Sequence, residues 1–156
     1  MVLRLVLMRH GKAEPPGEKP DEERSLTEEG RRDVEAVARL IPFKPSAILC
    51  SPLRRAVETA SIISMVHRVP YRIEEGLSPG IFSVEALQQI NPPDQAVLVG
   101  HAPSIERVTS ALVGGGFLKI GAGGMAIIEL ENLERSGGRL VLLIQPELAI
   151  KCLRGR

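Results

Sequence analysis

The sequence contains few aromatic residues and few cysteines, and it carries little net charge. Of its 156 residues only 3% are aromatic, with no Trp and a single Tyr. This scarcity argues against a surface that binds bases or sugars by stacking. A net charge of +1 gives the chain no general attraction for nucleic acid or acidic membranes. We therefore expect neither as a partner, and any affinity for an anion must come from locally clustered arginines.

The sequence also lacks the features of a secreted or membrane protein. Cys50 and Cys152 are far apart and do not have metal-site spacing, so we expect free thiols in a reducing compartment. The sequence alone leaves a disulfide between them open. The apolar run at the N-terminus is interrupted by Arg4 and does not resemble a signal peptide. No segment approaches the roughly 20 apolar residues of a transmembrane helix, so the expected location is cytoplasmic.

The composition is that of an ordinary globular protein, with 44% hydrophobic and 25% charged residues. The length suits one domain, and we predict a single domain over residues 1–156. A domain of this size buries roughly 70% of its unfolded surface. It therefore needs no disulfide or metal to fold.

Short apolar segments alternate with helical patterns along most of the chain. After the first strand, residues 12–25 read as a surface loop. The predicted N-caps are Thr27, Ser51 and Ser83, with Pro52 as the first residue of the second helix. Strands are predicted at residues 2–8, 47–50, 71–73, 96–99, 124–130 and 139–144, and helices near 28–41, 52–67, 84–90 and 103–113. This order predicts an α/β fold, a three-layer sandwich with a mostly parallel central sheet and the last two strands as an antiparallel pair at an edge.

Side chains suited to catalysis follow three of the predicted strands. The first strand ends in Arg9-His10-Gly11, the second in Ser51-Pro52-Leu53-Arg54-Arg55, and a later one in Gly100-His101. In open α/β sheets, ligands bind beyond the carboxyl ends of the strands. We therefore expect two of the three histidines and two or three arginines to meet at one edge of the sheet.

Each of these residues, taken alone, also has a purely structural explanation. A histidine after a strand is usually a capping or solvated residue, and Gly11 alone would mark a turn. Arg54 and Arg55 alone would be solvated helix charges. Arginine in the first turn of a helix opposes the helix dipole, however, and this conflict hints at a bound anion nearby. The convergence of several such residues is what favours a functional site.

This combination suits phosphoryl transfer through a covalent phosphohistidine. A neutral nitrogen of His10 would attack phosphorus, while its other nitrogen donates to a backbone carbonyl near Gly11. Arg9, Arg55 and His101 would hold the negative charge of the transition state. Because these side chains do what a magnesium ion does elsewhere, we expect no metal and no other cofactor.

The motifs together resemble the histidine phosphatase superfamily, which has the phosphoglycerate mutase-like fold. The resemblance covers roughly residues 2–113, and within the superfamily it is strongest to the small SixA-type phosphohistidine phosphatases. It implies that His10 is the nucleophile, that Arg9, Arg55 and His101 form the phosphate pocket, and that Arg24 matches a recurrent family arginine. The motifs that carry it are Arg9-His10-Gly11, Arg24-Ser25-Leu26-Thr27 with Gly30, Ser51 to Ala56 with Glu58-Thr59, and Val99-Gly100-His101.

The resemblance leaves the proton donor open. Most phosphatases of this fold have a Glu or Asp donor in the region that residues 74–79 occupy here. Glu75 is a candidate donor, and a solvated loop carboxylate is the alternative. SixA-type members lack a clear donor, and a departing imidazole needs less help than an alkoxide.

Alignment places Arg55 at the phosphate and leaves Arg54 free to meet a protein substrate.

The leading hypothesis is thus a phosphatase that removes phosphate from histidine in a phosphotransfer domain or a similar phosphoprotein. A second hypothesis is a phosphomonoesterase acting on a small substrate, such as a sugar phosphate or nucleotide. A third is an inactive module that binds phosphate or phosphopeptides. The presence of both His10 and His101 argues against the third, because a pure binder needs no nucleophile.

Overall fold

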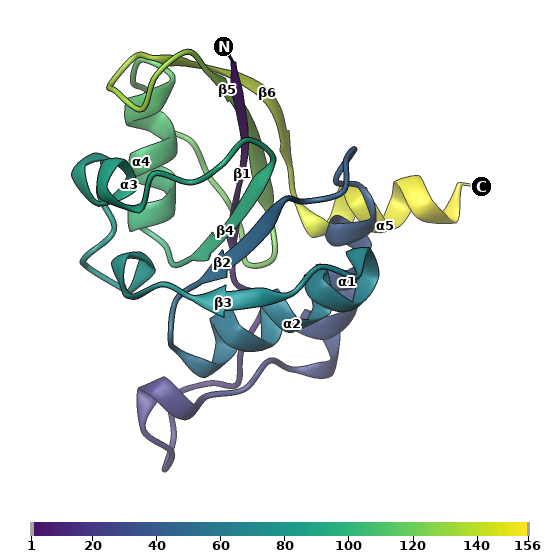
Figure 1. The fold of residues 1–156 in the computed structure, drawn as a ribbon. Coiled ribbons are helices and arrows are strands. Elements are labelled where there is room, and N and C mark those ends of the chain that lie inside the picture. Colours follow the sequence, from purple (N-terminus) through teal and green to yellow (C-terminus); the bar gives the residue numbers. More distant parts are fainter. Residues whose placement is uncertain (1, 156) are drawn as a thin grey trace.

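Six strands form one sheet with helices on both faces in the computed structural model, which describes residues 2–155 (Figure 1). The strands are β1 (Leu3–Arg9), β2 (Ala47–Cys50), β3 (Tyr71–Ile73), β4 (Ala96–Gly100), β5 (Met125–Leu130) and β6 (Gly138–Ile144). The helices are α1 (Glu28–Arg39), α2 (Arg54–His67), α3 (Val84–Ile90), α4 (Ser104–Leu112) and α5 (Pro146–Arg154), with 3-10 turns η1 (Asp21–Glu23) and η2 (Glu75–Leu77).

The strand order in the sheet is β3-β2-β4-β1-β5-β6. The first four strands are parallel, while β5 runs antiparallel to β1, and β6 antiparallel to β5. The predicted α/β fold with a mostly parallel sheet is therefore confirmed. The antiparallel pair is also confirmed, although only β6 lies at the edge. In this order β1, β4 and β2 are neighbours, so their carboxyl ends lie side by side.

Strand β1 is buried on both faces, which explains its continuous apolar sequence. Val6 and Met8 face the core formed with α1, α2 and α5, whereas Leu5 and Leu7 face the core formed with α3 and α4. Figure 1 shows these two groups of helices on opposite sides of the sheet. The three layers hold the ends of the central strands rigidly in register.

The N-caps follow the sequence prediction at two of three helices. The side chains of Thr27 and Ser83 accept hydrogen bonds from the first turns of α1 and α3. The prediction for α2 is wrong: the helix begins at Arg54, and its N-cap is Leu53. The hydroxyl of Ser51 instead contacts the ring of His101, so this residue belongs to the turn between strand and helix.

Helix α5 is not among the helices predicted from the sequence. In the structure Ala149 is fully buried in the same core as α1.

Cys50 is buried, Cys152 is exposed on α5, and both are free thiols. Within residues 2–155, the structure has no helix of the length and apolarity that a membrane crossing requires.

Candidate active site

Backbone hydrogen bonds lock the ends of three parallel strands together. The N–H of His10 donates to the carbonyl of Gly100 at 3.0 Å, and the N–H of Ser51 donates to that of Val99 at 3.1 Å. These bonds continue the registers of β1 and β2 against β4 by one residue. The side chains that follow the three strands therefore meet at one edge of the sheet, as the sequence predicts.

His10 lies in this cluster with a defined ring orientation. Its Nδ1 lies 2.7 Å from the carbonyl oxygen of Gly11. A carbonyl only accepts, so Nδ1 carries the proton and Nε2 keeps its lone pair. Burial lowers the pKa of His10 to about 4, helped by the charge of Arg55, although the bond to Gly11 opposes the shift. The imidazole is thus neutral near pH 7, which is the form that a nucleophile requires.

His101 faces His10 from the end of β4. The two ring centroids are 5.0 Å apart, and His101 is only 3% exposed. Its Nε2 lies 2.7 Å from the hydroxyl of Ser51. That hydroxyl already accepts the N–H of Leu53, which favours donation of its own proton to Nε2 and leaves Nδ1 of His101 as a donor. Burial lowers the pKa of His101 to about 3, and the neighbouring His10 adds to the effect.

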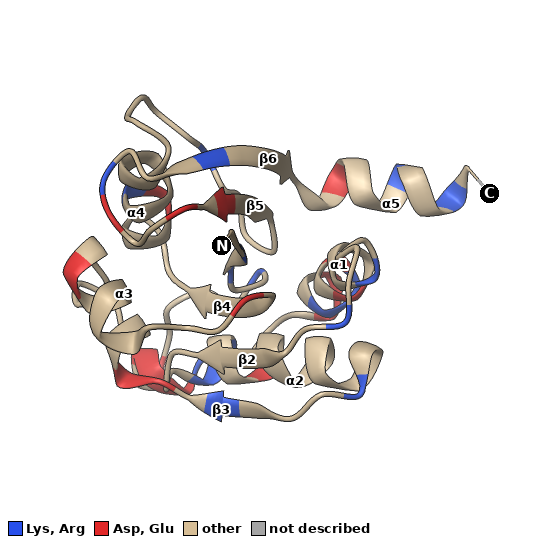
Figure 2. Cartoon of the chain, turned by 45° about the horizontal axis from the view of Figure 1, so that its top comes forward, with Lys and Arg blue, Asp and Glu red and all other residues tan. Residues whose placement is uncertain are grey.

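A cavity of about 340 Å3 brings the predicted residues together. No carboxylate lines it among the described residues. Acidic and basic residues are otherwise interspersed over the elements of the chain (Figure 2), in keeping with the small net charge. Positive charge is thus concentrated locally. The lining comprises Arg9, His10, Lys12, Ala13, Arg24, Arg55, Pro79, His101, Ala102 and Ala122.

The arginines are held by the protein in different ways. Arg9 donates through Nη1 to the carbonyl of Ile120 at 3.2 Å. The buried Arg55 donates to the backbone oxygen of Asp21 at 2.9 Å and to its carboxylate at 3.3 Å. Arg24 also pairs with that carboxylate, at 2.8 Å. Asp21 therefore anchors two of the three guanidinium groups from the loop before α1.

Several nitrogen atoms of this cluster have no protein partner. Within residues 2–155, four buried side-chain atoms lack a hydrogen bond, and three of them are Nε of Arg9, Nε of Arg55 and Nδ1 of His101. Buried polar groups are nearly always satisfied in folded proteins. Residues with three unsatisfied nitrogens thus line one cavity. A bound anion there would supply charge-assisted hydrogen-bond partners to such groups.

The structure separates the two adjacent arginines at the start of α2. Arg55 is buried at the cavity, whereas Arg54 points away and forms an ion pair with Glu58 at 3.0 Å. Glu75, the candidate proton donor, is exposed at the start of η2, and the cavity lining does not include it. The cavity is thus lined by Arg55 and not by Arg54, as the sequence predicts. Glu75 lies apart from the other predicted site residues.

Sequence reasoning missed several residues that support the site. Lys12 lines the cavity, and its amino group contacts Glu29 at 2.6 Å and Asp33 at 3.5 Å. Both Lys12 and Asp21 fall in the segment read as a surface loop, where no periodicity marks a role. Thr59 accepts the N–H of Gly11 at 3.1 Å and so ties the end of β1 to α2. The one sequence signal for Thr59 is its place in the motif of Ser51 to Ala56 with Glu58-Thr59.

Gly11 is needed for close packing rather than for a turn. A Cβ atom at Gly11 would lie 2.7 Å from Cγ2 of Val34 on α1. At Gly30 a Cβ would lie 2.2 Å from the carbonyl oxygen of Lys12. The two glycines therefore let the chain after His10 lie directly against α1.

Among the described residues, no group of three or more His, Cys, Asp or Glu side chains has the arrangement of a metal site.

Comparison with solved structures identifies the fold. The SixA protein histidine phosphatase complexed with tungstate has a TM-score of 0.79 at 19% identity, over 94% of this chain and 99% of that one. A candidate SixA phosphohistidine phosphatase from Nakamurella multipartitia has a TM-score of 0.77 at 24% identity, over 94% and 97%. A mycobacterial glucosyl-3-phosphoglycerate phosphatase has a TM-score of 0.69 at 19% identity, over 91% and 98%. At these identities the likeness shows a shared fold.

Sequence comparison adds the family. No curated protein matches the chain significantly. The family model described as the histidine phosphatase superfamily (branch 1) matches residues 5–79, which include most of β1, the loop before α1 and all of α2. Over these residues the chain is similar to the histidine phosphatase superfamily, and it shares the fold of the SixA structures.

Proposed function

We propose that the chain is a phosphatase that carries the phosphoryl group on His10 and removes it from phosphohistidine in another protein. The observation that carries the proposal is the cavity at the strand ends, where a neutral, oriented imidazole lies among Arg9, Arg24, Arg55 and His101 with no carboxylate in the lining. In this proposal the cations neutralise the phosphoryl oxygens, and the neutral imidazole supplies the nucleophile.

The proposed reaction has two steps. The lone pair on Nε2 of His10 forms a bond to phosphorus as the bond from phosphorus to the substrate's imidazole nitrogen breaks. That nitrogen leaves with the bonding electrons and takes a proton from water. A water molecule then attacks the phosphoryl group on His10, which releases phosphate and restores the neutral imidazole. Arg9, Arg55 and Nδ1 of His101 would stabilise the charge on the phosphoryl oxygens in both steps.

The lack of an acidic side chain in the lining favours phosphohistidine over a phosphate monoester. An alkoxide leaving group needs a positioned proton donor, whereas an imidazole nitrogen is protonated readily by solvent. Glu75 is exposed outside the cavity lining and is a weak candidate for that donor. The SixA proteins that share the fold are named for the activity we propose.

One observation favours the small-molecule alternative. A second cavity, of about 300 Å3, shares Lys12 and Ala122 with the first and is also lined by Lys119. Asp33 and Glu147 also line it, but Lys119 forms no ion pair within residues 2–155 and suits a small substrate with a second anionic group, such as a phosphoglycerate. One of the structures with this fold is named as a glucosyl-3-phosphoglycerate phosphatase.

Direct comparison of substrates tests the proposal. The purified chain is given free phosphohistidine, 3-phosphoglycerate and a sugar phosphate, and phosphate release is measured for each. We expect kcat/KM to be highest for phosphohistidine. Rapid hydrolysis of phosphoglycerate or the sugar phosphate, with none of phosphohistidine, would reject the proposed substrate in favour of the alternative.

The same assay tests the absence of a required metal. We expect turnover to be unchanged after treatment with EDTA, because the proposed charge stabilisation comes from arginine and histidine side chains. Activity that EDTA removes and a divalent cation restores would contradict the metal-free mechanism.

A cytoplasmic location remains part of the proposal, in keeping with two free thiols.

A further inference from the structure

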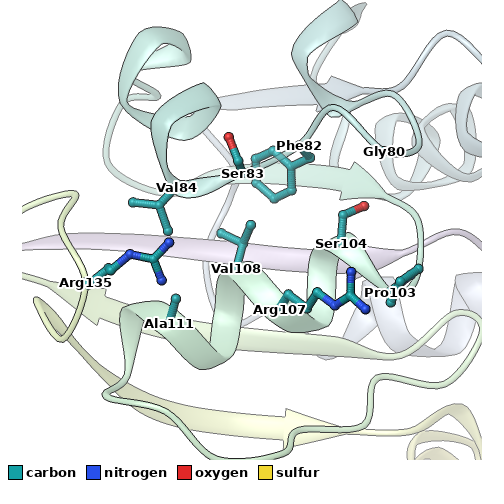
Figure 3. A pocket seen from close by; sticks show the side chains of 10 residues that line it. All are labelled: Gly80, Phe82, Ser83, Val84, Pro103, Ser104, Arg107, Val108, Ala111 and Arg135. Atoms are coloured by element: carbon teal, nitrogen blue, oxygen red, sulfur yellow. The ribbon is translucent and has the colours of Figure 1, made fainter.

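A groove runs along the outer side of α4, beside the candidate active site. One part is a cavity of about 380 Å3 between α4 and residues 80–84 (Figure 3). A second part, of about 510 Å3, continues along α4 to residues 115–118. The two parts share four lining residues, so we treat them as one feature, the α4 groove. The shared residues are Pro103, Arg107, Ala111 and Arg135.

The α4 groove begins where the active-site cavity ends. Pro79 and Ala102 line the active-site cavity, and the residues that follow them, Gly80 and Pro103, line the groove. The two hollows therefore border each other at two separate points of the chain. A polypeptide with its phosphorylated side chain at His10 can extend across this border into the groove.

The groove is lined by two unpaired arginines and one glutamate. Arg107 projects from α4, and Arg135 reaches the groove from the β5–β6 connection (Figure 3). Both are exposed, and within residues 2–155 neither forms an ion pair. The one carboxylate in the lining, Glu106, accepts the N–H of Ile120 at 2.8 Å. Two of the three charged side chains in the lining are thus arginines without an ion pair, and the groove carries a net positive charge.

Apolar side chains also line the groove. Phe82 and Val84 lie on one side and Val108 on the other (Figure 3). Phe117, which lines the part of the groove at residues 115–118, is a fully exposed aromatic side chain. Exposed apolar groups gathered beside a polar rim are characteristic of protein-binding surfaces. This surface suits a segment that combines acidic with apolar residues.

We propose that the α4 groove binds an acidic segment of the polypeptide substrate that flanks the phosphorylated histidine. The inference rests on the proposed function, because it assumes a protein substrate at His10. Helix α4 has nine residues and is therefore about 13 Å long, the span of about four residues of extended chain. The acidic residues that matter should thus lie within about six positions of the phosphohistidine.

Two peptides and two protein variants test this inference. Each peptide carries one phosphohistidine, and they differ only in that Asp and Glu at three to six positions to either side become Asn and Gln. The protein variants are Arg107→Glu with Arg135→Glu, and Arg72→Glu as a matched control at an exposed position of the edge strand β3. We measure kcat/KM for each peptide relative to free phosphohistidine, and binding of the dephosphorylated acidic peptide by fluorescence anisotropy.

We expect the wild type to prefer the acidic peptide about tenfold or more, and the double variant to lose this preference and the binding. The control variant should keep both. Equal rates for the two peptides, or a preference that survives the double charge reversal, would overturn the inference. A dimer that only the double variant dissociates would assign the groove to a second copy and also overturn it.

Failure of the proposed function is distinguishable from failure of the groove. If the chain hydrolyses no phosphohistidine but binds the dephosphorylated acidic peptide through Arg107 and Arg135, the groove inference stands and the proposed function falls. If free phosphohistidine is hydrolysed but the acidic peptide has no advantage and does not bind, the groove inference falls and the proposed function stands.

Discussion

At the scale of single residues, one position along α2 separates an arginine of the candidate phosphate pocket from a surface charge. Arg55 is 6% exposed and lines the cavity, whereas Arg54 pairs with Glu58 on the outside of the same helix. Adjacent residues on a helix point about 100° apart, so only one can face the strand ends. The pair therefore supplies an internal control for the proposed phosphate contacts.

Replacing Arg55 or His101 by Ala should slow turnover of free phosphohistidine by about a hundredfold or more, because each change removes a preorganised group that stabilises charge. Arg54→Ala should change it by less than about fivefold, since an exposed ion pair contributes little. Steady-state kinetics on the three variants measures these effects. Losses below tenfold for Arg55→Ala and His101→Ala would show that neither side chain holds the transferring phosphoryl group.

The half-buried His10 and the buried His101 predict a pH dependence of stability. Their folded-state pKa values, about 4 for His10 and about 3 for His101, lie below the usual value of 6.5 because burial disfavours the charged form. As the pH falls below 6.5, the unfolded chain gains protons that the folded chain does not. The free energy of unfolding should therefore decrease from pH 7 towards pH 4, by about 1 to 2 kcal/mol per histidine at pH 5.

Urea unfolding at pH 7.5 and pH 5.0 measures this dependence. A variant with His10→Asn and His101→Asn lacks both groups and should lose less free energy between the two pH values than the wild type. The comparison concerns the change with pH, so a general loss of stability in the variant does not obscure it. Equal changes in wild type and variant would show that these histidines are not buried in their neutral form.

At the scale of elements, the site depends on how closely the chain after β1 lies against α1. Gly30 faces the backbone of Lys12, and its neighbour across the contact, Gly11, follows His10 directly. A side chain at either glycine would push the backbone that follows His10 away from the helix. The family motif that contains Gly30 thus has a physical basis in the packing of a helix against a strand end.

Gly30→Ala should destabilise the protein by about 1 to 3 kcal/mol, because its Cβ would lie 2.2 Å from the carbonyl oxygen of Lys12. It should also lower activity, since His10 would shift with that backbone. Gly17→Ala is the matched control, with its nearest contact at 3.9 Å, and should change stability by less than about 0.5 kcal/mol. Urea denaturation and phosphatase assays measure both effects, and equal stability of the two variants would refute this packing argument.

The order of strands and helices could be predicted from periodicity, because the central strands are buried on both faces and the helices are amphipathic. The parts that could not be predicted depend on tertiary contacts. Helix α2 starts at Arg54 rather than Pro52 because Ser51 contacts His101 instead of capping the helix. Helix α5 is stabilised by burial of Ala149 against the core that includes α1.

The site shows the same division. The residues that directly follow strands could be placed in advance, since strand ends meet at one edge of a parallel sheet. Lys12 and Asp21 could not, because their positions depend on how an irregular loop folds back over the cavity. The α4 groove could not be predicted either, because Arg107 and Arg135 are far apart in the sequence and meet only in the folded chain.

At the scale of the whole molecule, function depends on uneven distribution of charge rather than on its total. The chain has a net charge of +1, yet the active-site cavity contains four basic side chains and no carboxylate among the residues that line it. The α4 groove adds two unpaired arginines beside it. This charge distribution would attract the phosphorylated, acidic polypeptide that we propose as substrate to one region of a nearly neutral protein.

The most direct test of this account is the site of covalent phosphorylation. The chain is mixed with radiolabelled phosphohistidine, quenched within the first turnover, and analysed by acid treatment and mass spectrometry. We predict an acid-labile phosphoryl group on His10, absent from His10→Ala, which should also lack activity. Full phosphatase activity in His10→Ala, or a label that lies on another residue, would contradict the assignment of His10 as the nucleophile.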